Sequence, residues 1–95
     1  MNNQKVSIII PTWNRSDALI DCIEKLFKEN VSYDKYEIIV CDSESTDNTV
    51  EKIDNFILEK NLKNLKIIQC PENSVTLKRN TGIRKANYEN IVLLD

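Results

Sequence analysis

Apolar residues along the chain follow two alternating patterns. Short runs rich in β-branched residues are typical of buried strands, whereas apolar residues three and four positions apart are typical of helices with one buried face. The strand-like runs cover Val6–Ile10, Tyr36–Cys41, Leu65–Gln69 and Asn90–Leu94. Polar or turn-forming residues bound each run, so we predict four short strands.

Three segments between these runs are predicted to be helices. The first has helically spaced apolar residues at Leu19, Ile20, Ile23, Leu26 and Phe27, and the second has them at Val50, Ile53, Phe56 and Ile57. We predict that Ser16 caps the first helix and that Ser45 caps the second, where Asp47 faces the positive end of the helix dipole. The third helix, Val75–Ala86, is weaker because Gly82 costs about 1 kcal/mol relative to alanine in a helix interior.

The alternation of strands and helices predicts a Rossmann-like α/β fold with the order βαβαβαβ. Helices that connect successive strands cover both faces of a mostly parallel sheet. In sheets of this kind, ligands bind at the carboxyl ends of the strands, where the strand order reverses. We therefore look for functional residues directly after each strand.

Composition narrows the class of protein. The chain of 95 residues has the size of a single domain, and its net charge of -2 argues against a nucleic-acid partner. No apolar run approaches the roughly 20 residues that cross a bilayer, so no membrane segment is predicted in this chain. Three cysteines without metal-site spacing are read as reduced, buried apolar residues, with a redox role as the alternative. These features predict a cytoplasmic location and leave membrane association of a longer parent open.

Polar side chains and one aromatic follow the predicted strands. Pro11 is expected to end the first strand and to turn Trp13 toward the ligand crevice, where a flat ring can stack on it, although a core position for Trp13 is the alternative. Asp42 places a carboxylate directly after an apolar strand, where it can accept the N–H of a pyrimidine. Asp95 follows the fourth strand, and its hard oxygen ligands suit Mg²⁺ or Mn²⁺ on a diphosphate.

Four stretches of the chain together resemble the successive motifs of one enzyme family. They are VSIIIPTWNR at 6–15, IIVCDSESTDNT at 38–49, KRNTGIRKA at 78–86 and IVLLD at 91–95. In order and spacing they resemble the family 2 glycosyltransferases of GT-A fold, and the resemblance spans the whole chain. It implies a transferase that moves a sugar from a nucleoside diphosphate, with a UDP-sugar favoured, inverts the anomeric carbon and uses Mn²⁺ or Mg²⁺.

The resemblance also implies roles for individual residues. Pro11, Thr12 and Trp13 would line the base pocket, and Asp42, followed by Ser43, would contact the uracil ring. A further set of polar residues, Lys78, Arg79 and Asn80, matches positions near the phosphates. Asp95 falls on the first aspartate of the D-x-D motif, which faces the ribose and the metal-bound diphosphate.

Two departures from the family pattern affect the prediction. Ser43 and Glu44 stand where the family often has aspartate and glycine, so the turn lacks glycine's tolerance of positive φ. The chain also stops at Asp95, so residues 1–95 are expected to be the N-terminal nucleotide-binding portion of a truncated domain, inactive alone and able to self-associate through an exposed edge. The acceptor, whether glycan, lipid or protein, stays open. The alternative is a non-catalytic nucleotide-binding or interaction module on the same fold.

Overall fold

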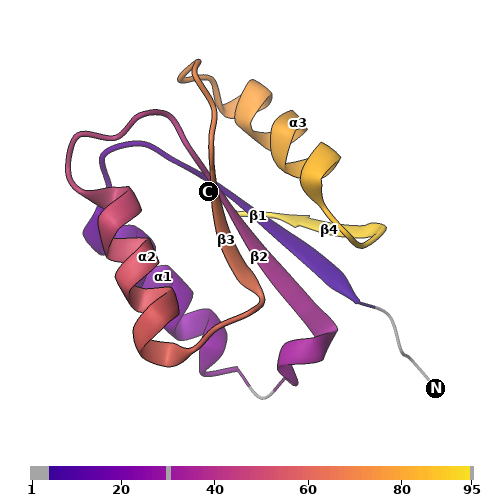
Figure 1. Cartoon of the computed structure of the whole chain (residues 1–95). Coiled ribbons are helices and arrows are strands. Elements are labelled where there is room, and N and C mark those ends of the chain that lie inside the picture. Colours follow the sequence, from indigo (N-terminus) through magenta and orange to yellow (C-terminus); the bar gives the residue numbers. More distant parts are fainter. Residues whose placement is uncertain (1–4, 30, 95) are drawn as a thin grey trace.

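The computed structural model describes residues 5–29 and 31–94 of the chain. The elements are β1 (Val6–Thr12), α1 (Ser16–Phe27), the 3₁₀ turn η1 (Tyr33–Lys35), β2 (Tyr36–Asp42), α2 (Thr49–Lys60), β3 (Leu65–Gln69), α3 (Val75–Lys85) and β4 (Asn90–Leu93). The strands form one sheet of order β3-β2-β1-β4, in which all neighbours run parallel (Figure 1). This arrangement confirms the predicted α/β fold with a parallel sheet.

Helices cover both faces of the sheet. In Figure 1, α1 and α2 lie together on one side of the strands, and α3 lies on the other. A large apolar cluster, centred on Ile38, Val40 and Ile53, joins the sheet to α1 and α2. A smaller cluster, made of Ile9, Ile39, Cys41 and Cys70, fills the α3 face. The strand order reverses at β1, which pairs with β2 on one side and β4 on the other.

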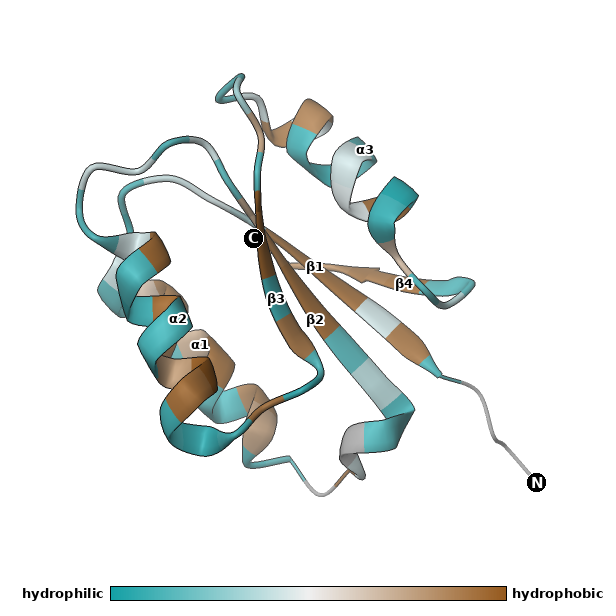
Figure 2. Ribbon diagram, viewed as in Figure 1, coloured by the Kyte–Doolittle hydropathy of each residue, from teal (hydrophilic) through white to brown (hydrophobic). Residues whose placement is uncertain are grey.

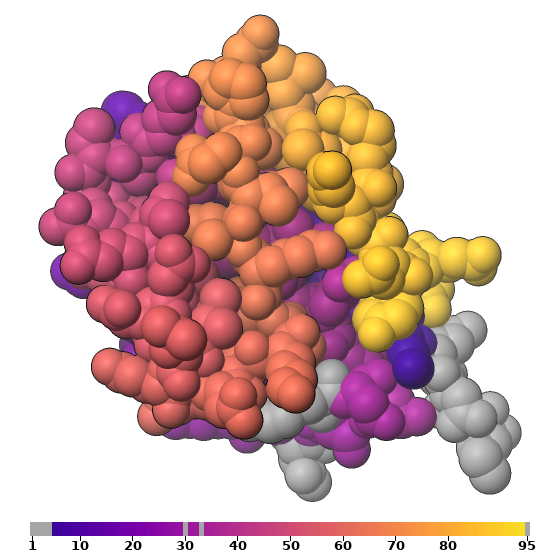
Figure 3. Space-filling model, in the orientation of Figure 1, coloured from indigo at the N-terminus to yellow at the C-terminus, as the bar shows by residue number. Residues whose placement is uncertain are grey.

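The strands are rich in apolar residues, and brown segments run along them in Figure 2. All seven residues of β2 are buried, because this strand has a neighbour on each edge and helices on each face. In the space-filling view, α2 and α3 flank the sheet and the β3 segment shows between them (Figure 3). No helix among residues 5–29 and 31–94 is long and apolar enough to cross a membrane.

The first strand is longer than predicted. We expected Pro11 to end it after Ile10, but β1 continues to Thr12, with Pro11 opposite Cys41 and Thr12 opposite Asp42. The pairing of β4 with β1 stops at Ile9, whose carbonyl accepts from Leu94 N–H at 3.0 Å. Backbone groups alternate in direction along a strand, so the nitrogen of Pro11 also points toward β4, beyond the paired residues. The missing N–H therefore breaks no bond of the ladder.

Both predicted helix caps are wrong. The first helix begins at Ser16 itself, and the residue before it, Arg15, makes no side-chain cap. The second helix begins at Thr49 after Asn48, which has a left-handed backbone with φ of 64°, so Ser45 is too early in the chain to cap it. The starts of the two helices are linked by other hydrogen bonds: Ser16 N–H donates to Asp47, and Ser45 Oγ accepts from Asn14 N–H. The third helix, not assigned a cap in advance, has Ser74 Oγ accepting from Leu77 N–H at 3.3 Å.

A buried carboxylate joins the sheet to the turn between α3 and β4. Glu37 on β2 is 7% exposed and accepts from Ser7 Oγ at 2.5 Å. It also accepts from the backbone N–H of Asn87 at 2.6 Å and from its side-chain amide at 2.9 Å. The turn that leads into the short strand β4 is thus held by a residue 50 positions away.

Candidate nucleotide-binding site

The carboxyl ends of the strands carry the polar residues predicted from the sequence. Thr12 is buried at the end of β1, while the side chain of Trp13 is 48% exposed. Asp42 ends β2, the strand beside β1. Trp13 directly follows Thr12, which pairs with Asp42 across the two strands, and a large aromatic residue that stays half exposed offers a surface suited to stacking a flat ligand. The exposure of Trp13 excludes the alternative of a core position.

Asp42 is fully buried and bonded within the protein. One oxygen, Oδ1, accepts from the hydroxyl of Ser45. The other, Oδ2, accepts from Ser45 N–H at 3.1 Å and from Gln69 Nε2 at 2.9 Å. Its relative exposure is 0%, so a ligand N–H reaches this carboxylate only after one of these donors moves.

Gln69 is the residue that sequence reasoning missed. It ends β3 and lies exposed beside Asp42, with its Oε1 accepting from Glu44 N–H at 2.9 Å. This bond fastens a turn in which Glu44 has a φ of 51°, a left-handed conformation for which glycine is the usual residue. A polar residue at the end of an apolar strand was the available signal, the same one that singled out Asp42.

The loops after β1 and β2 are tied to each other. Asn14, with φ of 50°, donates its backbone N–H to Ser45 Oγ at 2.8 Å. Its side-chain oxygen accepts from Thr46 N–H at 2.7 Å. Ser45 also donates its backbone N–H to Asp42. The same hydrogen-bond network therefore connects Asp42, the carboxylate predicted to contact the base, with the loop that carries Trp13.

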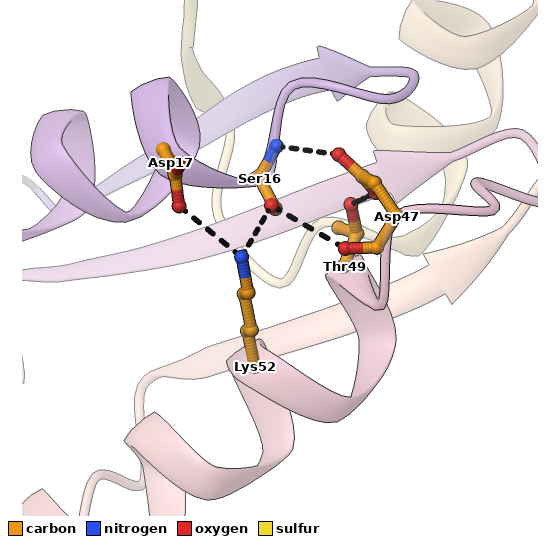
Figure 4. Close-up of polar contacts among 5 residues, drawn as sticks. All are labelled: Ser16, Asp17, Asp47, Thr49 and Lys52. Atoms are coloured by element: carbon orange, nitrogen blue, oxygen red, sulfur yellow. Dashed lines mark hydrogen bonds and ion pairs between the residues drawn. The ribbon is translucent and has the colours of Figure 1, made fainter.

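A second network lies at the starts of α1 and α2 (Figure 4). Asp47 accepts from the backbone N–H of Ser16 at 2.9 Å and from the hydroxyl of Thr49. Lys52 Nζ donates to Ser16 Oγ at 2.9 Å and pairs with Asp17 at 3.1 Å. The Thr49 hydroxyl, followed by the Ser16 N–H, holds the pKa of Asp47 below its usual value. The carboxylate therefore caps α1 from the loop that precedes α2.

The motif residues of α3 divide between the interior and the surface. Lys78 was expected beside phosphates, but its side chain is 2% exposed and its Nζ donates to Thr12 O at 3.1 Å and to Asn73 Oδ1 at 2.7 Å. Arg79 is half-buried and Asn80 is exposed. Ser43 is buried, and its hydroxyl donates to the carbonyl of Glu72 at 3.0 Å. These buried side chains thus connect the loop after β3 to the ends of β1 and β2.

The cysteines are free thiols. Cys41 and Cys70 are both buried, and Cys22 is partly buried. Burial, followed by the charge and hydrogen bond of neighbouring Cys70, raises the pKa of Cys41 to about 12. Cys41 is thus protonated at neutral pH and behaves as an apolar core residue, in line with the interpretation from the sequence.

The proposed metal ligand, Asp95, lies outside the described residues. Within the described ranges, no group of three or more His, Cys, Asp or Glu side chains could hold a metal ion. The carboxylates of the site do not change this, because Asp42 is occupied by Ser45 and Gln69, and Asp47 by Ser16 and Thr49. The part of the site that the structure describes thus holds no complete donor set for a cation.

Solved structures of glycosyltransferases share the fold of this chain. The mannosyltransferase PcManGT from Pyrobaculum calidifontis, in complex with GDP-Man and Mn²⁺, matches with a TM-score of 0.84 at 24% identity over 92% of this chain and 26% of its own, a likeness of fold. TarS 1-349 from S. aureus, in complex with UDP-GlcNAc, matches with a TM-score of 0.80 at 27% identity over 97% of this chain and 26% of its own.

Curated relatives bear glycosyltransferase names. A dolichyl N-acetyl-alpha-D-glucosaminyl phosphate 3-beta-D-2,3-diacetamido-2,3-dideoxy-beta-D-glucuronosyltransferase from Methanococcus voltae is 32% identical over 93% of this chain and 27% of its own length. Chondroitin synthase from Escherichia coli is 35% identical over 95% of this chain and 13% of its own. The chain therefore spans about a quarter or less of these relatives. Because the family model described as Glycosyl transferase family 2 matches residues 7–95, the chain belongs to that family.

Proposed function

We propose that residues 1–95 are the N-terminal nucleotide-binding portion of a glycosyltransferase domain that takes its sugar from a UDP-sugar. The observation that carries the proposal is the half-exposed Trp13 directly after Thr12, which pairs with the buried Asp42 at the carboxyl ends of two adjacent strands. Membership of the family supports the reaction class, and the UDP-GlcNAc complex of TarS supports the donor class. The acceptor is a glycan, lipid or protein group that the donor portion does not define.

Base recognition would combine stacking with one hydrogen bond. In this proposal, the base stacks on Trp13, and its ring N–H replaces the Gln69 amide as donor to Asp42 Oδ2. Uracil carries such an N–H, whereas the corresponding nitrogen of cytosine is an acceptor. Pro11 and Thr12 would border the base, Ser43 would set the turn after Asp42, and Arg79 and Asn80 would lie toward the phosphates.

We further propose that a divalent cation, Mn²⁺ or Mg²⁺, accompanies the diphosphate and that Asp95 is one of its ligands. The Mn²⁺ in the PcManGT complex supports this proposal. A bound cation would offset the negative charge of the leaving diphosphate. We also propose that transfer inverts the configuration of the anomeric carbon, as the resemblance implies. NMR of the product tests this, because it shows the anomeric configuration.

Calorimetric titration of the intact protein with UDP and with CDP, each with and without Mn²⁺, tests the donor site. We expect UDP to bind more tightly than CDP. Trp13→Ala should weaken UDP binding by about 5- to 150-fold if stacking is worth roughly 1 to 3 kcal/mol. Trp13→Phe keeps a ring and serves as the matched control, with a smaller loss.

Several results would contradict the proposal. Equal binding of UDP and CDP would remove the role of Asp42, and an unchanged affinity in Trp13→Ala would remove the stacking platform. If the intact protein turned over no nucleotide sugar with any of a panel of acceptors while still binding UDP, the non-catalytic nucleotide-binding module would replace the enzyme.

A further inference from the structure

The side chain of Lys78 reaches from the first turn of α3 to the end of β1, 66 positions earlier in the chain. Its Nζ donates to the carbonyl oxygen of Thr12 at 3.1 Å and to Asn73 Oδ1 at 2.7 Å. Both acceptors are neutral oxygens, and the residue is only 2% exposed. Lysine is rarely buried to this degree, so this ammonium ion does not act as an ordinary surface charge.

The carbonyl that Lys78 holds belongs to the peptide between Thr12 and Trp13. A peptide unit is planar, so a hydrogen bond to its oxygen fixes the direction in which the following residue leaves it. On the other side of Trp13, the backbone N–H of Asn14 is held by Ser45 Oγ at 2.8 Å. The backbone of Trp13 is therefore fixed at both ends, while its ring remains 48% exposed.

We propose that Lys78 is a positioning residue that orients Trp13 for stacking and does not itself touch the phosphates of the ligand. Asn73, in the loop after β3, anchors the ammonium from the other side. Lys78 thereby makes the stacking platform depend on α3 as well as on the loop after β2. The ligand class, a nucleoside diphosphate, rests on the proposed function, whereas the link between Lys78 and Trp13 stands without it.

The experiment follows the indole N–H resonance of Trp13, assigned by its loss in Trp13→Phe, in protein without ligand. Lys78→Met keeps an unbranched side chain one atom shorter than lysine and removes both hydrogen bonds, and we expect it to shift or broaden this resonance. Lys85→Met, an exposed position on the same helix, is the matched control and should leave the resonance unchanged. UDP affinity should fall by about 2- to 10-fold in Lys78→Met, because UDP binding must then also fix the orientation of the Trp13 ring. UDP affinity should be unchanged in Lys85→Met.

Two outcomes would overturn the inference. An unchanged Trp13 resonance in a folded Lys78→Met protein would show that the lysine does not orient the ring. A fall in UDP affinity with that resonance unchanged would assign Lys78 to direct contact with the ligand. If wild-type protein bound no UDP while the resonance still moved in Lys78→Met, the proposed function would fail and the positioning role would hold.

Asn73→Ala keeps the test decisive if Lys78→Met does not fold. Asn73 is an exposed loop residue, so its replacement leaves the core intact and removes only one anchor of the ammonium. We expect a smaller displacement of the same resonance. No displacement in this variant would count against the inference.

Discussion

Gly82 on α3 faces Ile9 on β1 so closely that a Cβ added to the glycine would lie 2.5 Å from Ile9 Cγ2. The same Cβ would lie 3.0 Å from the sulfur of Cys41. Both neighbours are fully buried in the central strands and have little room to move. The glycine inside α3, which weakens the helix, thus lets the helix approach the sheet.

Gly82→Ala should therefore destabilise the fold although alanine favours helices. Overpacking a dense core costs about 1 to 3 kcal/mol, against a gain of about 1 kcal/mol in helix propensity. We expect a net fall in the free energy of unfolding, measured by urea denaturation. Thr76→Ala, at an exposed position of the same helix, is the control and should be neutral or slightly stabilising. Greater stability of Gly82→Ala would show that α3 can move away from the sheet at no cost.

Glu37→Ala should be among the most destabilising single substitutions. It would leave two donors of Asn87 and the hydroxyl of Ser7 without their buried acceptor, at a cost of about 1 to 3 kcal/mol for each group that finds no water. Chemical denaturation measures the loss. Glu89→Ala, which replaces an exposed glutamate on the turn that contains Asn87, should change stability by less than about 0.5 kcal/mol. Equal effects of the two substitutions would contradict the role of the buried carboxylate.

Asp47 should make stability depend on acidity. Its pKa in the folded protein lies below the ordinary value of 3.8, so its contribution is complete above pH 3.8 and is lost as the pH falls through the folded pKa. Asp47→Asn should therefore differ from wild type more at pH 6 than at pH 2, when the free energy of unfolding is compared by urea denaturation. A difference that grew toward low pH would reverse the assigned sign.

Glu44→Gly should stabilise the turn after β2. A non-glycine residue in the left-handed region costs about 1 to 2 kcal/mol, part of which returns as added freedom of the unfolded chain. We expect a gain of up to about 1 kcal/mol in the free energy of unfolding. Glu51→Gly, in the first turn of α2, should instead lose up to about 1 kcal/mol. A loss in both variants would mean that the Glu44 side chain contributes a contact that outweighs its backbone strain.

The elements of the fold could be predicted because burial leaves a local signal. Residues 38–41 of β2 are all buried and apolar, because both faces of the strand are covered, so this stretch reads as an apolar run in the sequence. The start of α2 could not be predicted in the same way, since Ser45 bonds Asp42 within its own turn and Asn14 in a tertiary contact that capping rules do not include. The extension of β1 through Pro11 depended on where β4 stops pairing, which is equally non-local.

The sequence identified candidate site residues, whereas the contacts of these residues with the rest of the protein could not be predicted from it. Trp13 and Asp42 stand out because a large aromatic and a carboxylate follow apolar strands. Lys78 was interpreted as a ligand contact because it matches a motif position near the phosphates, and only the structure places its ammonium between Thr12 and Asn73. The proposed contacts of these residues with a nucleotide stay predictions.

β4 pairs with β1 along only four residues. The free energy of local opening should therefore be lower for β4 than for the central strands of the sheet. β2 is hydrogen-bonded on both edges, whereas β4 meets one strand within the described residues and leaves Val92 and Leu93 more than two-fifths exposed. Amide protons of β4 should thus exchange with solvent well before those of β2, and its free edge is where two copies of the chain would first adhere. The segment that leads into Asp95 therefore belongs to the part of the sheet that opens most easily.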